Sequence, residues 1–267
     1  MTFSIKGVFR RTQAILRQAW LPITLVTVAT MVLPVCAQDY IRAHMFDGPG
    51  LGISLSLDRL RAIVLVTMIG MYFLHAFHMG AVNELAIRIE AAKPLKAWQL
   101  ARNAAINAVP VFVIDVLFHG GILAGAVLLL VPGLLFGVVF SVVTPAYICE
   151  RKGLFEAFAR SYRLTDGHRW QIFAAWLVII VVVNVISACI ALPDLSWIGG
   201  LIHRFFPDMT FVVFSRPPPV SPPIRVLALL VGTALKTLMI VFNAAVYLAL
   251  RFDTTAPVDP RIEEVFE

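Results

Sequence analysis

Polar residues that could carry chemistry stand inside long apolar runs of this sequence. Asp115 and Lys236 bear charges of opposite sign, and His75 and Asn184 can both donate and accept hydrogen bonds. Each of the four lies about 13 to 15 residues from a basic residue at the end of its run that we expect to be cytoplasmic. At about 1.5 Å per helical residue this is about 20 Å, close to the middle of a membrane. We therefore expect these four residues to form one mid-membrane polar layer.

Such a layer has two interpretations. A buried carboxylate or ammonium ion costs several kcal/mol when it stands alone, so Asp115 and Lys236 should form an interhelical ion pair. His75 and Asn184 would then satisfy the remaining donors and acceptors. In the alternative, the layer binds a substrate or passes protons in the permeation path of a transporter. The sequence lacks matching pairs of helices broken by glycine or proline, which are a sign of transporter sites.

A metal centre is a third possibility, which histidine spacing raises. His75 and His78 are three residues apart, Asp115 and His119 are four apart, and each spacing puts two ligand-type side chains on one helical face. His78 and His119 should nevertheless differ in depth by about 10 Å, and no cysteine lies nearby. We therefore expect separate histidines with hydrogen-bond partners, and we predict no metal or other cofactor.

The helices that must position these residues follow from composition. The chain has 60% hydrophobic and 14% charged residues, against about 45–50% and about 25% in soluble domains. Apolar runs of about 18 to 26 residues can cross a hydrocarbon layer of about 30 Å. We predict an all-α integral membrane domain over residues 1–251, followed by a short tail, 252–267. Its six spans should cover residues 20–37, 60–82, 106–131, 133–149, 170–192 and 224–250, with a turn at Pro132–Gly133.

The distribution of charge predicts the topology. The 22 lysines and arginines exceed the 16 acidic residues, but they stand between apolar runs rather than in one patch, so nucleic acid is not an expected partner. Most of them lie in residues 1–19, in alternate connections between spans and in the tail. The positive-inside rule then puts both termini in the cytoplasm. The rival interpretation of the first run is a signal peptide cleaved after Val35-Cys36-Ala37.

Three connections share a layout that suggests an internal repeat. The sequences Lys6-Gly7-Val8-Phe9, Lys93-Pro94-Leu95-Lys96 and Lys152-Gly153-Leu154-Phe155 each open a short amphipathic stretch before a span. We predict three units, each an interfacial helix followed by a hairpin of two spans. The basic faces should meet anionic lipid headgroups of the bilayer. The alternative is that these stretches are ordinary amphipathic linkers.

One stretch carries a more specific pattern. Residues 128–173 contain a Pro-Gly pair, a later Pro and Glu, and an Ala-Phe-x-Arg-Ser-Tyr-x-Leu-x-x-Gly-x-x-Trp run. This stretch resembles the membrane domain of bacterial glycerophosphoryl diester phosphodiesterases and its stand-alone, six-span relatives. The resemblance implies architecture only, because in fused members the hydrolase chemistry belongs to a separate soluble domain, which we do not expect here. The residues that carry it are Pro132, Gly133, Pro145, Glu150, Arg160, Ser161, Gly167 and Trp170.

Motifs typical of soluble enzymes are missing from the sequence. There is no Walker A sequence, HExxH or GxSxG. Gly121 and Gly125 form a GxxxG pair, which predicts a close contact between helices. The cysteines Cys36, Cys149 and Cys189 lack CxxC spacing, so we expect reduced thiols. We predict a non-enzymatic component that is resident in the membrane or organises it; the alternatives are a transporter that uses the polar layer and a membrane metalloprotein.

Overall fold

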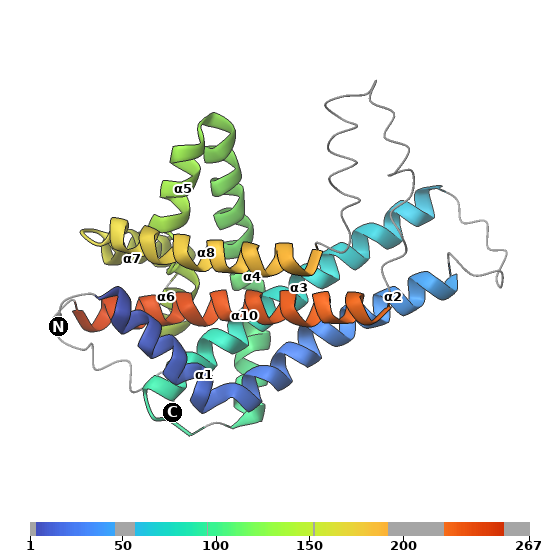
Figure 1. The fold of residues 1–267 in the computed structure, drawn as a ribbon, viewed down its shortest axis with the longest axis horizontal. Helices are drawn as coiled ribbons and strands as arrows, with labels where there is room; N and C mark the ends of the chain where they lie inside the picture. The colour runs from blue at the N-terminus through green and yellow to red at the C-terminus, as the bar shows by residue number, and fades with distance from the viewer. Residues whose placement is uncertain (1–3, 46–56, 95, 152, 192–221, 254–267) are drawn as a thin grey trace. The chain divides into compact units, whose positions relative to one another are not determined.

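The described part of the chain is helical throughout. The computed structural model describes residues 4–45, 57–94, 96–151, 153–191 and 222–253, and these contain no strand (Figure 1). The predicted outer loop around residues 193–221, the tail from residue 254 and Lys152 lie outside the described residues. The helices are α1 (Ile5–Thr27), the π-helix η1 (Val28–Val32), α2 (Leu33–Met45), α3 (Leu57–Glu90), α4 (Ala97–Leu128), α5 (Leu130–Val139), α6 (Val143–Glu150), α7 (Leu154–Thr165), α8 (Arg169–Ala191) and α10 (Pro222–Asp253).

Several of these helices are long and apolar enough to cross a membrane. Five described segments meet that requirement, and the pair Leu154–Thr165 and Arg169–Val183, bent by 98°, would make a sixth. The prediction of an all-α chain with about six such segments is therefore confirmed at this level. The five are Ile5–Tyr40, Arg61–Glu90, Ala97–Leu128, Val131–Glu150 and Val226–Arg251.

The predicted boundary between the first amphipathic stretch and the first span coincides with a kink. Ala19 has non-helical angles, φ −115° and ψ 19°, inside α1. Pro22 lies three residues further on, where its ring removes a hydrogen bond and crowds the preceding turn. The second stretch behaves differently, because α4 runs unbroken from Ala97 to Leu128. The interfacial helix expected before residue 106 is thus the first part of a longer helix.

The hairpin between α4 and α5 turns earlier than predicted. The break lies at Leu129, whose extended backbone has φ −164° and ψ 141°, and not at Pro132–Gly133. Pro132 falls in the first turn of α5, where a missing N–H costs nothing. The predicted glycine contact is confirmed: a Cβ on Gly125 would lie 2.7 Å from the Gly133 nitrogen, and one on Gly121 would clash with the Phe136 ring. Small residues let the two backbones touch.

The span predicted over residues 133–149 is confirmed as one apolar segment, Val131–Glu150, but its helix is interrupted and forms α5 and α6. Turn residues Phe140, Ser141 and Val142 separate α5 from α6. The break frees backbone carbonyl groups, and the one on Val139 accepts hydrogen bonds from Ser161 Oγ at 2.8 Å and Thr165 Oγ1 at 3.2 Å. Two hydroxyl groups of α7 thus satisfy an acceptor that an unbroken helix would have satisfied itself.

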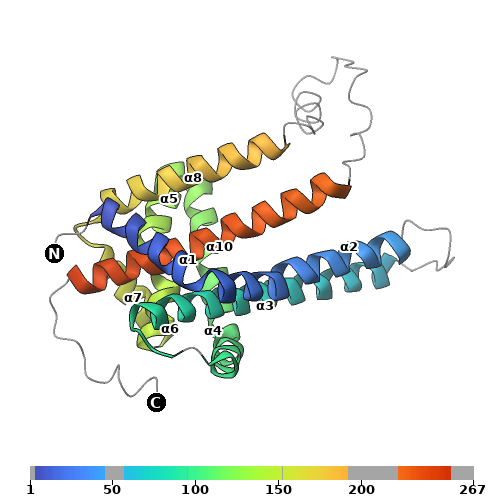
Figure 2. The same cartoon turned by 60° about the horizontal axis from the view of Figure 1, so that its bottom comes forward.

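The described chain forms two compact units. The first comprises residues 1–175 and 237–267, and the second comprises residues 176–236. In the first unit α1 lies beside α3 (Figure 2), and α3 also packs against α4. Its core surrounds the last third of α3, where all eight residues from Ala81 to Arg88 are buried, and includes Val241–Val246 of α10. The described side chains of the second unit are mostly exposed and apolar.

Candidate functional site

Asp115, the centre of the predicted polar layer, pairs within its own helix. Its Oδ1 lies 3.1 Å from Nδ1 of His119, one turn further along α4. The Asp115 side chain is 7% exposed and that of His119 is 65% exposed. His75 is half-buried in α3. Lys236 belongs to the second unit, where it is exposed, so its pairing with Asp115 stays a prediction. The Asn184 side chain lies outside the described residues.

His78, the other weak metal candidate, is fully buried among hydroxyl groups. Its Nδ1 lies 3.0 Å from Thr30 Oγ1 and its Nε2 lies 3.1 Å from Thr237 Oγ1, which is 3.2 Å from Thr27 Oγ1. Hydroxyls both donate and accept, so both ring nitrogens of a neutral imidazole find partners. Thr30 belongs to η1, whose wider turn shifts the following residues around the helix. The described residues include no group of three or more ligand-type side chains that could hold a metal ion.

A second cluster centres on Glu84, which the sequence interpretation missed. Glu84 Oε1 accepts hydrogen bonds from Arg88 Nε at 2.9 Å and from Asn103 Nδ2 of α4 at 2.7 Å. The side chains of Glu84 and Arg88 are only 3% and 6% exposed. The i, i+4 spacing of an acidic and a basic residue is visible in the sequence. The span predicted from the apolar run ends at residue 82, so the prediction leaves both residues outside the helix, whereas α3 continues to Glu90.

A third cluster joins α6, α7 and α10 around Glu150. Its Oε1 accepts from Arg160 Nε at 2.8 Å and from the Tyr247 hydroxyl at 3.2 Å. Beside it, Arg251 Nη1 donates to Cys149 Sγ at 2.7 Å. Two of the motif residues, Glu150 and Arg160, therefore dock α7 onto α6. Cys149 is a buried free thiol and Cys36 an exposed one, whereas the Cys189 side chain lies outside the described residues.

Other motif residues have roles in the backbone. Pro145 stands in the first turn of α6, where its missing N–H is harmless. Gly167 has φ +75° in the turn between α7 and α8, a conformation that L residues with a side chain seldom adopt. Trp170 is 79% exposed. Together with Ser161, whose hydroxyl donates to the Val139 carbonyl freed at the break after α5, Pro145 and Gly167 shape the path of the chain around α7.

The apolar face of the first amphipathic stretch packs against protein rather than lipid. Val8, Thr12 and Ile15 are buried, and the Phe9 ring lies 5.7 Å from that of Phe242 in α10. Arg11 pairs with Glu90 of α3 at 3.0 Å. The opposite face keeps its basic residues exposed: Lys6, Arg10 and Arg17. The stretch is therefore a fixed part of the first unit, and its basic face is open to ligands.

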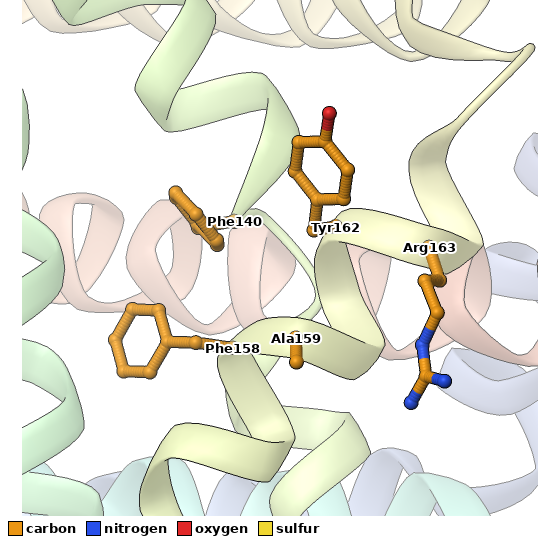
Figure 3. A pocket seen from close by; sticks show the side chains of 5 residues that line it. All are labelled: Phe140, Phe158, Ala159, Tyr162 and Arg163. Atoms are coloured by element: carbon orange, nitrogen blue, oxygen red, sulfur yellow. The ribbon is translucent and has the colours of Figure 1, made fainter.

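A hollow of about 600 Å³ opens beside α7. Figure 3 shows its lining, with the rings of Phe140 and Phe158 on one side of Ala159 and the exposed side chain of Arg163 on the other. The Phe140 and Phe158 rings lie 5.2 Å apart, edge to face. Tyr162 completes the lining, and Arg169 stacks over its ring at 4.7 Å. The hollow combines an aromatic wall with a nearby cation, which suits a ligand that is part apolar and part anionic.

No family model, curated protein or solved structure matches the chain. The resemblance to the phosphodiesterase membrane domain stays a prediction from its motif residues.

Proposed function

We propose that this chain is a multi-pass protein of the bacterial cytoplasmic membrane with a non-enzymatic role in organising the surrounding lipid. The observation that carries the proposal is the angle between α7 and α8. The two helices are bent by 98° around Gly167. If α8 crosses the bilayer, α7 runs along its surface. Glu150, Arg160 and Ser161 hold it there through the contacts described above.

The exposed face of α7 and that of α1 suit a lipid surface. Phe155 and Tyr162 are 83% and 50% exposed on α7, next to Arg163. Aromatic side chains favour the headgroup region, and basic side chains attract anionic lipid there by about 1 kcal/mol each. The basic face of α1, which is Lys6, Arg10 and Arg17, adds to the same attraction. We propose that these faces gather anionic lipid around the protein.

Lipid enrichment tests this role directly. The full chain, reconstituted in vesicles of phosphatidylglycerol and phosphatidylcholine, should transfer energy from its tryptophans more strongly to dansyl-phosphatidylglycerol than to dansyl-phosphatidylcholine. High salt should remove the difference, as should replacement of Lys6, Arg10 and Arg17 with glutamine. Arg61→Gln is the control, because it removes an exposed cation near the start of α3 rather than from the basic face of α1. This variant should leave the difference between the two lipids unchanged. Equal transfer to both lipids at low salt would overturn the proposal.

The proposed topology places both termini in the cytoplasm, on the support of the basic connections. Single cysteines introduced in the N-terminal segment, near Lys93 and in the tail should be protected from an impermeant thiol reagent in intact cells, and one near Pro218 should react. The chain with only its natural cysteines gives the background. Labelling in the N-terminal segment but not near Pro218 would reverse the assignment.

A transporter is the second candidate, and the break between α5 and α6 favours it. Discontinuous helices often line the substrate sites of transporters. Asp115 on the adjacent α4 would be the functional carboxylate. On this alternative, Asp115→Asn should abolish the uptake of a solute by reconstituted vesicles without loss of folded protein. If Asp115→Asn leaves the flux of every tested ion and solute unchanged, Asp115 no longer supports the transporter alternative.

A further inference from the structure

We propose that the hollow beside α7 binds one anionic phospholipid, with an acyl chain against its aromatic wall and the phosphate at Arg163. The inference rests on the proposed function, but it names a site rather than a general attraction. A basic surface alone would gather lipid without holding any molecule in place. The arrangement of rings next to the hollow supplies the specific feature.

The aromatic wall continues from the hollow along α5 to α4. Phe140 lies 5.2 Å from Phe158 in the hollow and 4.5 Å from Phe136 one turn back in α5, and Phe136 lies 6.5 Å from Phe118 of α4. All four side chains are half-buried, so each offers part of its surface to the outside. Each step lies within the range of contact between aromatic rings, about 4.5–7 Å, so the four rings form a continuous chain of contacts from the hollow to α4. Such an apolar surface suits an acyl chain.

The charged end of the site fits a lipid headgroup. Arg163 is exposed on α7, the helix proposed to lie along the membrane surface, and no ion pair to it is found among the described residues. Arg160, one turn earlier in the helix, is already paired with Glu150. A guanidinium at headgroup level binds a phosphate with two parallel hydrogen bonds. Phosphatidylcholine also carries a phosphate, but its choline cation competes with Arg163 for that group, so the site favours a lipid of net negative charge such as phosphatidylglycerol.

Native mass spectrometry of the full chain in detergent, titrated with phosphatidylglycerol, tests the site. We expect one tightly held lipid adduct. Ala159→Trp should fill the hollow and weaken the adduct about tenfold or more, which corresponds to about 1.4 kcal/mol. Ala159 is exposed, so the larger side chain leaves the core intact. Arg163→Gln should reduce the preference for phosphatidylglycerol over phosphatidylcholine while an adduct still forms.

Matched controls separate this site from the general attraction. Phe155→Ala removes an exposed ring from the same helix outside the hollow, and Arg17→Gln removes an exposed cation from α1; neither should weaken the adduct. Undiminished binding by Ala159→Trp, or equal losses in Phe155→Ala, would overturn the inference. If Ala159→Trp loses the adduct in the mass spectrum but still enriches phosphatidylglycerol in vesicles, both proposals are supported as separate effects. An adduct without enrichment in vesicles would keep the site and refute the organising role.

Discussion

The two ends of α3 face opposite surroundings. Residues 61–70 are exposed apart from the half-buried Thr67, and they are almost all apolar after Arg61. Residues 81–88 are all buried, and they include Asn83, Glu84 and Arg88. In a water-soluble helix the apolar residues would be inside and the charges outside. The reversal agrees with the proposed membrane location, in which the exposed apolar side chains of α3 contact lipid and its buried polar side chains contact protein.

The largest losses of stability should come from breaking the ion pair between Glu84 and Arg88 at the buried end of α3. Replacing either Glu84 with Leu or Arg88 with Met strands a buried charge, which costs about 3–5 kcal/mol of unfolding free energy. The double variant should recover much of that loss, because no charge is left without a partner. Unfolding in mixed detergent micelles, followed by circular dichroism, measures each value. Arg17→Met, which removes an exposed cation, is the control; single losses that simply add in the double variant would contradict the pairing.

Disrupting the close backbone packing between α4 and α5 should lower the unfolding free energy less than breaking the Glu84–Arg88 ion pair. It should lower it more than a change at the exposed end of α3. A Cβ on Gly133 would lie 2.7 Å from the Ala126 nitrogen and 2.8 Å from the Ile122 oxygen, and a backbone cannot yield as a side chain does. We expect Gly133→Ala to lower the unfolding free energy by about 1–3 kcal/mol. Gly120→Ala in α4, with open space around it, should be neutral or slightly stabilising in the same assay. Equal stability of the two variants would show that the hairpin can open without cost.

The smallest effects should come from the exposed end of α3. Val66 is 69% exposed, so Val66→Ala should change the unfolding free energy by less than about 0.5 kcal/mol. Val82→Ala makes the same chemical change at a fully buried position and should cost about 1–3 kcal/mol because it leaves a cavity. The same detergent titration compares the pair. A larger loss at Val66 would mean that this surface packs against protein.

The sequence was sufficient for features that depend on neighbouring residues. Apolar runs, the amphipathic face around Val8 and Ile15, and the glycine pair at Gly121 and Gly125 all follow from local spacing. The turn at Leu129 was misplaced by three residues, since proline is as acceptable in the first turn of a helix as in a turn before it. Such errors are small because they leave the order of helices unchanged.

Features that depend on distant partners could not be predicted. The burial of Glu84 needs Asn103 from another helix, so its side chain looked like the end of a span. The break after Val139 needs hydroxyls from Ser161 and Thr165, more than twenty residues later. Asp115 was assigned a partner by depth alone, and depth does not exclude the nearer His119. A polar residue in an apolar run predicts that a partner exists, but not which residue it is.

The Glu150 cluster also sets an order of events during synthesis. Arg160 is ten residues from Glu150 along the chain, whereas Tyr247 is 97 residues away. A ribosome makes the chain from its N-terminus, so the contact with Arg160 can form long before α10 exists. The contact between Thr27 and Thr237 spans 210 residues and must wait for the same helix. Until α10 is made, Thr27 and His78 lack their hydrogen-bond partner Thr237, and such polar groups are what a quality-control protease or chaperone would recognise in an unfinished protein.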